Sequence, residues 1–230
     1  MYNNNDVIGY LQTNRILALK LDHAASAVGE QVKDDVSITG KGATRLLYYT
    51  SCFTREYNDV CQQQKREDLR FRNAVIRILN NGDVIYEMLR IYFEEILKYK
   101  TREQLDQIKK ALMAVNVHVA ASTLTGAGYA LAVATSVRIG LNLNVQLSVL
   151  TGRAAGTVAG IVATYGLVQN AADSARRLHL RYPAYYFALY IQQMEMMYFL
   201  IEPLFDRAGA LDAQWSSDSA LANIIARMIR

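Results

Sequence analysis

The chain has 230 residues and a mass of 25.8 kDa, a length that fits one large domain or two small ones. Hydrophobic residues make up 52% and charged residues 20%, a composition that excludes an intrinsically disordered chain. The 25 basic residues barely exceed the 21 acidic ones, which argues against nucleic-acid binding, and only two prolines interrupt helices. We therefore expect an all-α, multi-helix bundle that forms a single helical domain over residues 1–230.

The first elements expected in chain order are two helical regions separated by a loop. An approximate 3.6-residue apolar pattern predicts a helix over residues 6–29, with Asp6 as its N-cap. Residues 34–42 combine acidic residues with two glycines and predict a loop. A long helix or a helix pair should follow over residues 43–79, because the polar run at residues 61–72 fits either a solvated helix face or a break.

The next two helices have clear start signals. Residues 80–82 predict a turn, and Asp83 should cap a helix over residues 84–97, where apolar residues recur at steps of three and four. Thr101 and Gln104 fit a capping box, in which each side chain satisfies a free backbone amide of the other. The helix that begins there should lead directly into the middle of the chain.

The C-terminal part of the chain also reads as helical. Pro183 suits the first turn of a helix that runs through residues 185–202, with Pro203 near its end. The last helix should start at Ser217 or Asp218.

The unusual feature of the sequence is a charge-poor segment at residues 111–172, whose only charged residues are Arg138 and Arg153. They leave uncharged stretches of 27, 14 and 19 residues, and a membrane-spanning helix needs about 20 apolar residues. Much of the segment is Ala and Val rather than Leu and Ile, so it fits either a helical hairpin buried in a bundle or one that enters a bilayer. A surface for self-association is a third interpretation.

Small residues recur along this segment at helical spacing. Gly152, Gly156 and Gly160 are four residues apart, so they lie along one narrow stripe of a helix, on which a second helix can approach closely. We expect this stripe, together with Gly126 and Gly128, to pack the helices of the hairpin. Arg138 and Arg153 would then lie at a membrane interface or inside a pore.

Residues 176–190 place arginines before a run of aromatic residues, as at membrane interfaces. A buried aromatic helix with a charged start is the alternative interpretation. The candidate interface residues are Arg176, Arg177, Arg181, Tyr182, Tyr185 and Tyr186.

No residue pattern indicates catalysis, a cofactor or a metal site. His23, His118 and His179 lie far apart, and we expect His118 to be a hydrogen-bonded core residue of an apolar helix. Cys52 and Cys61 are expected to be reduced thiols, because the N-terminus has no signal peptide. The sequence thus predicts a protein that is not an enzyme, binds no nucleic acid and is made in the cytoplasm.

The hairpin AVNVHVAASTLTGAGYALAVATSV and the glycine stripe GRAAGTVAGIVA, enclosed by polar amphipathic helices, resemble bacterial pore-forming toxins. The resemblance covers residues 101–205 and is to colicin-type pore domains and, in size, to small pore-forming effectors of the type VI secretion system. It implies delivery by a specialised secretion system to a target-cell membrane.

The function expected from the resemblance is permeabilisation or depolarisation of a target membrane. The partners would be lipid, further copies of the chain in the membrane, and an immunity protein or secretion adaptor. The alternative is a soluble all-helical interaction protein, an adaptor or immunity partner, with a buried glycine-rich hairpin.

Overall fold

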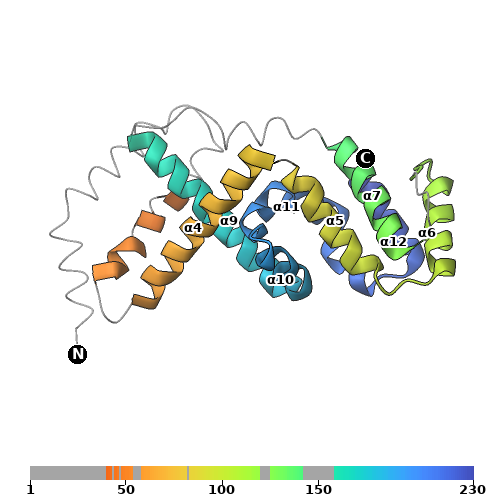
Figure 1. Cartoon of the computed structure of the whole chain (residues 1–230), viewed down its shortest axis with the longest axis horizontal. Helices are drawn as coiled ribbons and strands as arrows, with labels where there is room; N and C mark the ends of the chain where they lie inside the picture. Colours follow the sequence, from red (N-terminus) through yellow and green to blue (C-terminus); the bar gives the residue numbers. More distant parts are fainter. Residues whose placement is uncertain are drawn as a thin grey trace. The chain divides into compact units, whose positions relative to one another are not determined.

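The computed structural model describes residues 40–42, 44–46, 48–53, 58–81, 83–119, 125–141 and 158–230. These residues form α-helices and 3-10 helices without a strand, which confirms the all-α fold (Figure 1). The expected helix over residues 6–29 lies outside the described residues. Residues 40–42, expected to end a loop, are helical instead.

The chain divides into two compact units, whereas the sequence predicts one domain. Two of the three boundaries fall inside long helices, α4 (Asn58–Asn81) and α9 (Val158–Arg181). Unit 1 comprises Met1–Arg72 with Gly152–Asp173, and unit 2 comprises Asn73–Thr151 with Ser174–Arg230. The described parts of the charge-poor segment therefore belong to both units, since α7 (Gly126–Gly140) is in unit 2 and α9 begins in unit 1.

Unit 1 contains the helical residues between 40 and 49, the 3-10 helix η1 (Thr50–Phe53) and the first part of α4. Helix α4 passes without interruption through residues 61–72, so the polar run there is a helix face and not a break. Leu69 is exposed on that face, whereas Phe71 and Ala74 are buried. The apolar and polar sides of α4 thus follow the helical period.

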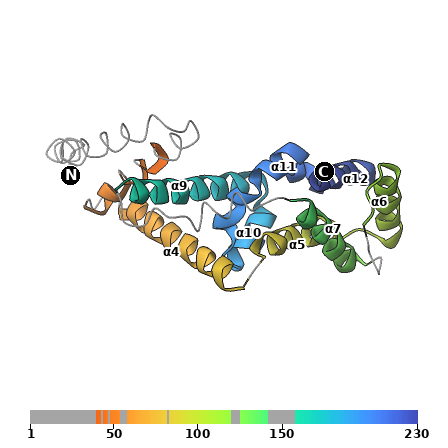
Figure 2. The ribbon, with the colours of Figure 1, turned by 90° about the horizontal axis from the view of Figure 1, so that it is seen from above.

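Unit 2 is built around α5 (Val84–Leu97), which packs against α7. Helix α12 (Asp218–Ile229) packs against both α7 and α6 (Arg102–Ala114), and it lies beside them in both views (Figures 1 and 2). The predicted start of α5 is confirmed, because the backbone N–H of Tyr86 donates to the side chain of Asp83.

Helix α6 begins as predicted and ends earlier than predicted. The capping box is complete, with Thr101 and Gln104 each accepting from the backbone amide of the other. The helix stops at Ala114, and Asn116 has a φ of 59°. Asn tolerates this left-handed conformation better than most residues, so it can turn the chain where the apolar pattern alone would extend the helix.

The helix expected from Pro183 onward is broken into three. Helix α10 (Pro183–Ile191) begins with that proline, but Gln193 has a φ of 56° and ends the helical run. The 3-10 helix η2 (Glu195–Leu200) and then α11 (Glu202–Ala208) follow, with Pro203 in the first turn of α11 and not at a helix end.

The end of unit 2 has two further caps. Gly209, with a φ of 70°, leads from α11 into the 3-10 helix η3 (Ala210–Trp215). Ser217 caps α12 by accepting from the backbone N–H of Ala220, as predicted.

An aromatic cluster holds the centre of unit 2. The rings of Tyr92 and Phe205 lie 4.7 Å apart, and the ring of Tyr185 stacks on Phe205 at 5.8 Å. The hydroxyl of Tyr92 donates to the carbonyl of Ala210, and that of Tyr185 donates to the carbonyl of Met88. These bonds satisfy the polar ends of two fully buried rings.

Candidate functional site

Helix α7 carries the part of the charge-poor segment that unit 2 buries. Thr125 caps it by accepting from the backbone N–H of Gly128, and Leu141 follows its C-terminus. The side facing α5 and α12 is made of one large and four small residues, all buried: Tyr129, Ala130, Val133, Ala134 and Val137. The small side chains let the neighbouring helices approach closely.

A glycine at each end of α7 lies close to the backbone of a neighbouring helix. A Cβ at Gly126 would lie 3.1 Å from the carbonyl oxygen of Leu97, at the end of α5. A Cβ at Gly140 would lie 2.5 Å from the carbonyl oxygen of Ile229, at the end of α12. In this fold Gly126 therefore lies against the end of α5, and its predicted packing within a membrane hairpin stays a prediction. Gly140 makes the tighter contact of the two.

The triple glycine stripe is only partly described. Gly160 lies in the first turn of α9, whereas Gly152 and Gly156 are outside the described residues, as is Arg153. Self-packing through this stripe stays a prediction. Gly128, the other predicted packing residue, is half-buried beside the cap of α7.

Arg138 binds Asp83, the residue that caps α5. Its Nε lies 2.7 and 2.6 Å from the two carboxylate oxygens of Asp83. Both side chains are about one-third exposed, so the ion pair is worth at most about 1 kcal/mol. In this fold Arg138, the only charged residue of α7, therefore joins α7 to the start of α5. Its location at a membrane interface or in a pore stays a prediction.

The predicted interface residues of α9 and α10 separate into buried and exposed groups. Tyr182 and Tyr185 are in the core of unit 2, in agreement with the interpretation of a buried aromatic helix and not with a membrane interface for these two residues. Burial raises the pKa of both phenols, and for Tyr185 the phenols of Tyr198 and Tyr92 raise it further. The helical period explains the burial of Tyr185, because Tyr185 and Leu189 are four residues apart and share the inward face of α10.

The remaining predicted interface residues stay at the surface. Arg176, Arg177 and Arg181 are exposed on the last turns of α9, and Tyr186 is half-buried. Arg177 pairs with Glu202 at 2.6 Å, and Arg181 pairs with Asp206 at 3.0 Å. Arg177 and Arg181 are thus bound to carboxylates of α11, and a membrane contact of this group stays a prediction.

Unit 1 contains a fully buried arginine that the sequence did not single out. Arg45 has no exposed side-chain surface, and its guanidinium donates five hydrogen bonds. The acceptors lie on α4 and α9: Asp68 Oδ1 takes two bonds, at 3.0 and 2.6 Å, and Glu67 Oε2, Gln169 Oε1 and the carbonyl of Gln64 take one each, at 2.9, 3.1 and 3.1 Å. A guanidinium has five N–H donors, so every one is used within the chain.

Asp68 completes this arginine cluster. Its second carboxylate oxygen accepts from the hydroxyl of Tyr49, whose ring contacts Tyr165 of α9 edge-on. Burial raises the pKa of the Asp68 carboxyl, while the charge and hydrogen bonds of Arg45 lower it. Because burial is the larger effect, Asp68 takes up a proton at a higher pH than an exposed aspartate. The cluster holds three segments of unit 1 together and leaves no arginine N–H for a ligand.

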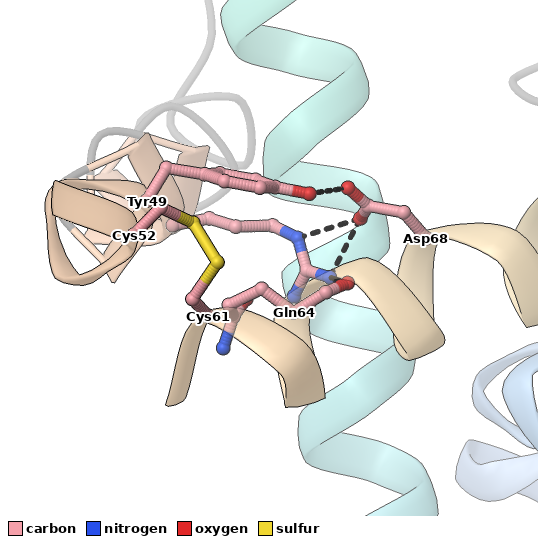
Figure 3. The surroundings of a disulfide bond; sticks show 6 residues. Tyr49, Cys52, Cys61, Gln64 and Asp68 are labelled. Atoms are coloured by element: carbon pink, nitrogen blue, oxygen red, sulfur yellow. Dashed lines mark hydrogen bonds and ion pairs between the residues drawn. A yellow bond between two sulfur atoms is a disulfide. The ribbon is translucent and has the colours of Figure 1, made fainter. Parts of the chain in front are cut away.

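A disulfide lies beside the arginine cluster. Cys52 and Cys61 are bonded, with Cα atoms 4.9 Å apart, so our prediction of reduced thiols is wrong (Figure 3). Figure 3 shows the bond next to Tyr49, Gln64 and Asp68. It closes a loop of nine residues, which removes about 2.5 kcal/mol of chain entropy from the unfolded state. The expectation rested on the cellular compartment, and such reasoning does not detect that the fold places Cys52 of η1 beside Cys61 of α4.

Two of the three histidines, His118 and His179, lie in the part of the chain that the structure describes. His118 follows the end of α6 and is exposed, which corrects its prediction as a core residue of a helix. His179 is exposed on α9 and stacks on Tyr186 at 4.3 Å, and His23 is outside the described residues. Within the ranges that the structure describes, no group of three or more His, Cys, Asp or Glu side chains is placed to hold a metal ion.

The helices were considered as membrane spans, and the chain was compared with known proteins. Among the helices that the structure describes, none has both the length and the apolar character that crossing a bilayer requires. No protein-family model matches the chain, and neither the curated proteins nor the solved structures gave a match. The described residues thus form an all-α protein in which a charge-poor helix, α7, packs against α5 and α12, and a buried arginine cluster holds unit 1.

Proposed function

We propose that the protein permeabilises a membrane and that α7 is the element it inserts into lipid, as in bacterial pore-forming toxins and effectors. The observation that carries the proposal is the outward face of α7. Ala127, Leu131, Thr135 and Ile139 follow one another at steps of four along this face, all exposed and none charged. A solvent-facing helix side normally carries charged residues, so this face favours a second, apolar environment.

Apolar burial is the main interaction that holds α7 in the bundle. Each buried methylene contributes about 0.8 kcal/mol, and four of the five buried residues are Ala or Val. The fifth, Tyr129, has a hydroxyl without a hydrogen-bond partner among the described residues, so no hydrogen bond of this group opposes release. The ion pair of Arg138 with Asp83 is partly exposed and adds little.

Insertion requires α7 to lengthen. Its 15 residues span about 22 Å as an α-helix, against a hydrocarbon core of about 30 Å. The uncharged stretch at residues 111–137 supplies 27 positions, enough for a span if the turn after α6 becomes helical in lipid. Association of the inserted chains through Gly152, Gly156 and Gly160 is the second part of the proposal.

A second candidate function is a helical interaction protein, such as an adaptor or an immunity partner. The observation that favours it is that α7 packs against α5 and α12 through side chains that are fully buried. In that case the small residues serve only the core, and the exposed face of α7 contacts a protein.

Potassium release from liposomes at neutral and mildly acidic pH separates the two functions. Leu131→Lys introduces a charge on the outward face, where Leu131 is 48% exposed, and Leu69→Lys makes the same change at a 54% exposed position of α4. A lysine in the middle of a span costs about 2.5–3.5 kcal/mol, roughly a hundredfold in insertion. A surface lysine changes folding stability by less than about 0.5 kcal/mol.

We expect wild type and Leu69→Lys to release potassium and Leu131→Lys to release almost none, while all three melt alike. No release by the wild type, or equal release by Leu131→Lys, would reject insertion of α7 and favour the interaction protein. Gly156→Leu tests the second part: it should abolish release while the protein still binds vesicles, and an active Gly156→Leu protein would exclude assembly through the glycine stripe.

A further inference from the structure

A short helical segment of unit 1, which we call the bridging segment, contacts both α4 and α9. It consists of residues 40–42, 44–46 and 48–53. Arg45 donates to Asp68 of α4 and to Gln169 of α9. Further contacts of the bridging segment with α9 are the edge-on ring contact of Tyr49 with Tyr165 and a hydrogen bond of 2.6 Å from Lys41 to Asn170. The bridging segment therefore connects two helices that lie far apart in the sequence.

The disulfide attaches the bridging segment covalently to α4. Cys52 lies in η1, at the end of the bridging segment, and Cys61 lies near the start of α4. Cys61, Gln64 and Asp68 follow one another at steps of three and four residues, so they share one face of α4. The face of α4 that accepts the hydrogen bonds of Arg45 thus also holds the disulfide (Figure 3).

The two bonded cysteines differ in their exposure. Cys61 is 1% exposed, whereas Cys52 is partly exposed. A thiol that attacks the bond must reach one of its sulfurs, so it approaches from the side of Cys52. Exposed disulfides are typical of labile or regulatory bonds, whereas structural disulfides resist reduction. The chain has two cysteines in total, so no third thiol of the chain competes for either sulfur.

We propose that the Cys52–Cys61 bond is a redox-controlled attachment, which a dithiol reductant opens in the folded protein to release the bridging segment from α4. One thiolate of the reductant attacks Sγ of Cys52, and the S–S bond breaks as Cys61 leaves with the electron pair and takes up a proton. The second thiolate of the reductant then displaces Cys52, which also takes up a proton. The reductant ends as a disulfide, and the protein gains two electrons and ends with two thiols.

Reduction should loosen the contacts of the bridging segment with α9. The bond closes a loop of nine residues, and the chain entropy that its removal restores favours opening by roughly sixtyfold. Residues 158–172 of α9 belong to the charge-poor segment, so a reducing environment should open this part of it more often than an oxidising one. The inference concerns the stability of unit 1 and does not require the protein to act on membranes.

Alkylation after incubation with dithiothreitol, in the absence of denaturant, tests whether the bond opens in the folded protein. Two variants test the side of attack, because Cys61→Ala leaves Cys52 as the single thiol and Cys52→Ala leaves Cys61. We expect the reductant to convert the wild type to two thiols while circular dichroism still reports its helices, and Cys52 to be alkylated faster than Cys61. A bond that resists dithiothreitol until urea is added would overturn the proposal, and faster alkylation of Cys61 would overturn the attack on Cys52.

Amide hydrogen exchange of the oxidised and the reduced wild type, read by mass spectrometry, measures the release of α9. Peptides from residues 44–53 and 158–173 should exchange roughly sixtyfold faster after reduction, while peptides from α5 and α12 of unit 2 keep their rates. The matched control is the double variant Cys52→Ala with Cys61→Ala, whose exchange dithiothreitol should not alter because it has no sulfur to reduce.

Two outcomes of the exchange measurement would contradict the proposal. Equal rates for residues 158–173 in the oxidised and the reduced wild type would show that the bond does not control α9. Faster exchange in α5 and α12 as well would show that reduction unfolds the whole protein and does not release one segment. Both measurements are made without lipid, so they are independent of potassium release.

Discussion

Removal of the Arg45 guanidinium should destabilise unit 1 far more than removal of any exposed arginine. Arg45→Met keeps most of the side-chain length but leaves Glu67 and Asp68 facing each other's charge without a cation. The matched control is Arg66→Met, the same change at an exposed position of α4 next to Glu67. Arg45→Lys keeps the charge but supplies three donors in place of five.

The magnitudes follow from burial. Removal of one partner from a buried ion pair costs about 3–5 kcal/mol, and because the side chains of Glu67 and Asp68 are 14% and 29% exposed, we expect the lower end, about 3 kcal/mol, for Arg45→Met. Arg45→Lys loses at least two bonds but keeps the ion pairing, so about 2 kcal/mol is expected. Arg66→Met should cost less than about 0.5 kcal/mol.

Amide hydrogen exchange read by mass spectrometry assigns the effect to the correct unit. Peptides from residues 44–53 and 61–72 report on unit 1, and peptides from α5 and α12 report on unit 2. A loss of 3 kcal/mol corresponds to roughly a hundredfold faster exchange where exchange follows the opening equilibrium. If Arg45→Met exchanges like Arg66→Met in the unit 1 peptides, the arginine cluster does not hold the unit together.

Three further predictions concern unit 2. Tyr129→Phe should leave the free energy of unfolding unchanged or raise it by up to about 1 kcal/mol, because its hydroxyl is buried without a hydrogen bond in the described fold. Tyr185→Phe should lower it by about 1 kcal/mol, because it removes the hydrogen bond that this hydroxyl donates to the carbonyl of Met88, and urea unfolding compares the two variants. Gly140→Ala should lower the melting temperature, although Ala favours helices, because its Cβ would lie 2.5 Å from the carbonyl oxygen of Ile229, well inside ordinary contact. An unchanged or higher melting temperature would contradict this packing. Burial raises the pKa of buried tyrosines, including Tyr92 and Tyr185, so their contribution to stability is complete below about pH 10 and is lost as the pH rises further, because the unfolded state ionises first. Phenolate absorbance should therefore appear in two steps, the second together with loss of helix by circular dichroism, and a single step with the helix intact would refute the assignment.

Local signals allowed much of the helical layout to be predicted. Asp83, Thr101 with Gln104, and Ser217 mark helix starts through side-chain bonds to amides within three residues, so a short stretch of sequence contains the whole interaction. Helix ends were harder. Asn116 and Gln193 end helical runs with a positive φ, and neither residue type forces that conformation in the way that proline forces a break.

Long-range features could not be predicted for a different reason. Arg45 and Gln169 are 124 positions apart, and the sequence shows nothing that pairs them until α4 and α9 are placed. The disulfide, the division into two units and the burial of Tyr185 likewise depend on tertiary packing. The glycine at position 126 was recognised from composition, yet its contact with the end of α5 required the fold.

The interleaving of the two units determines when each can be completed during synthesis. Gln169, one of the acceptors of Arg45, leaves the ribosome more than a hundred residues after the arginine, and α12, which packs against α6 and α7, emerges long after both of them. Neither unit can therefore close soon after its first helices have been made. A chain stopped after α7 would expose the charge-poor helix without α12 to cover it, so a partner or chaperone that shields nascent chains would find α7 accessible for most of that time.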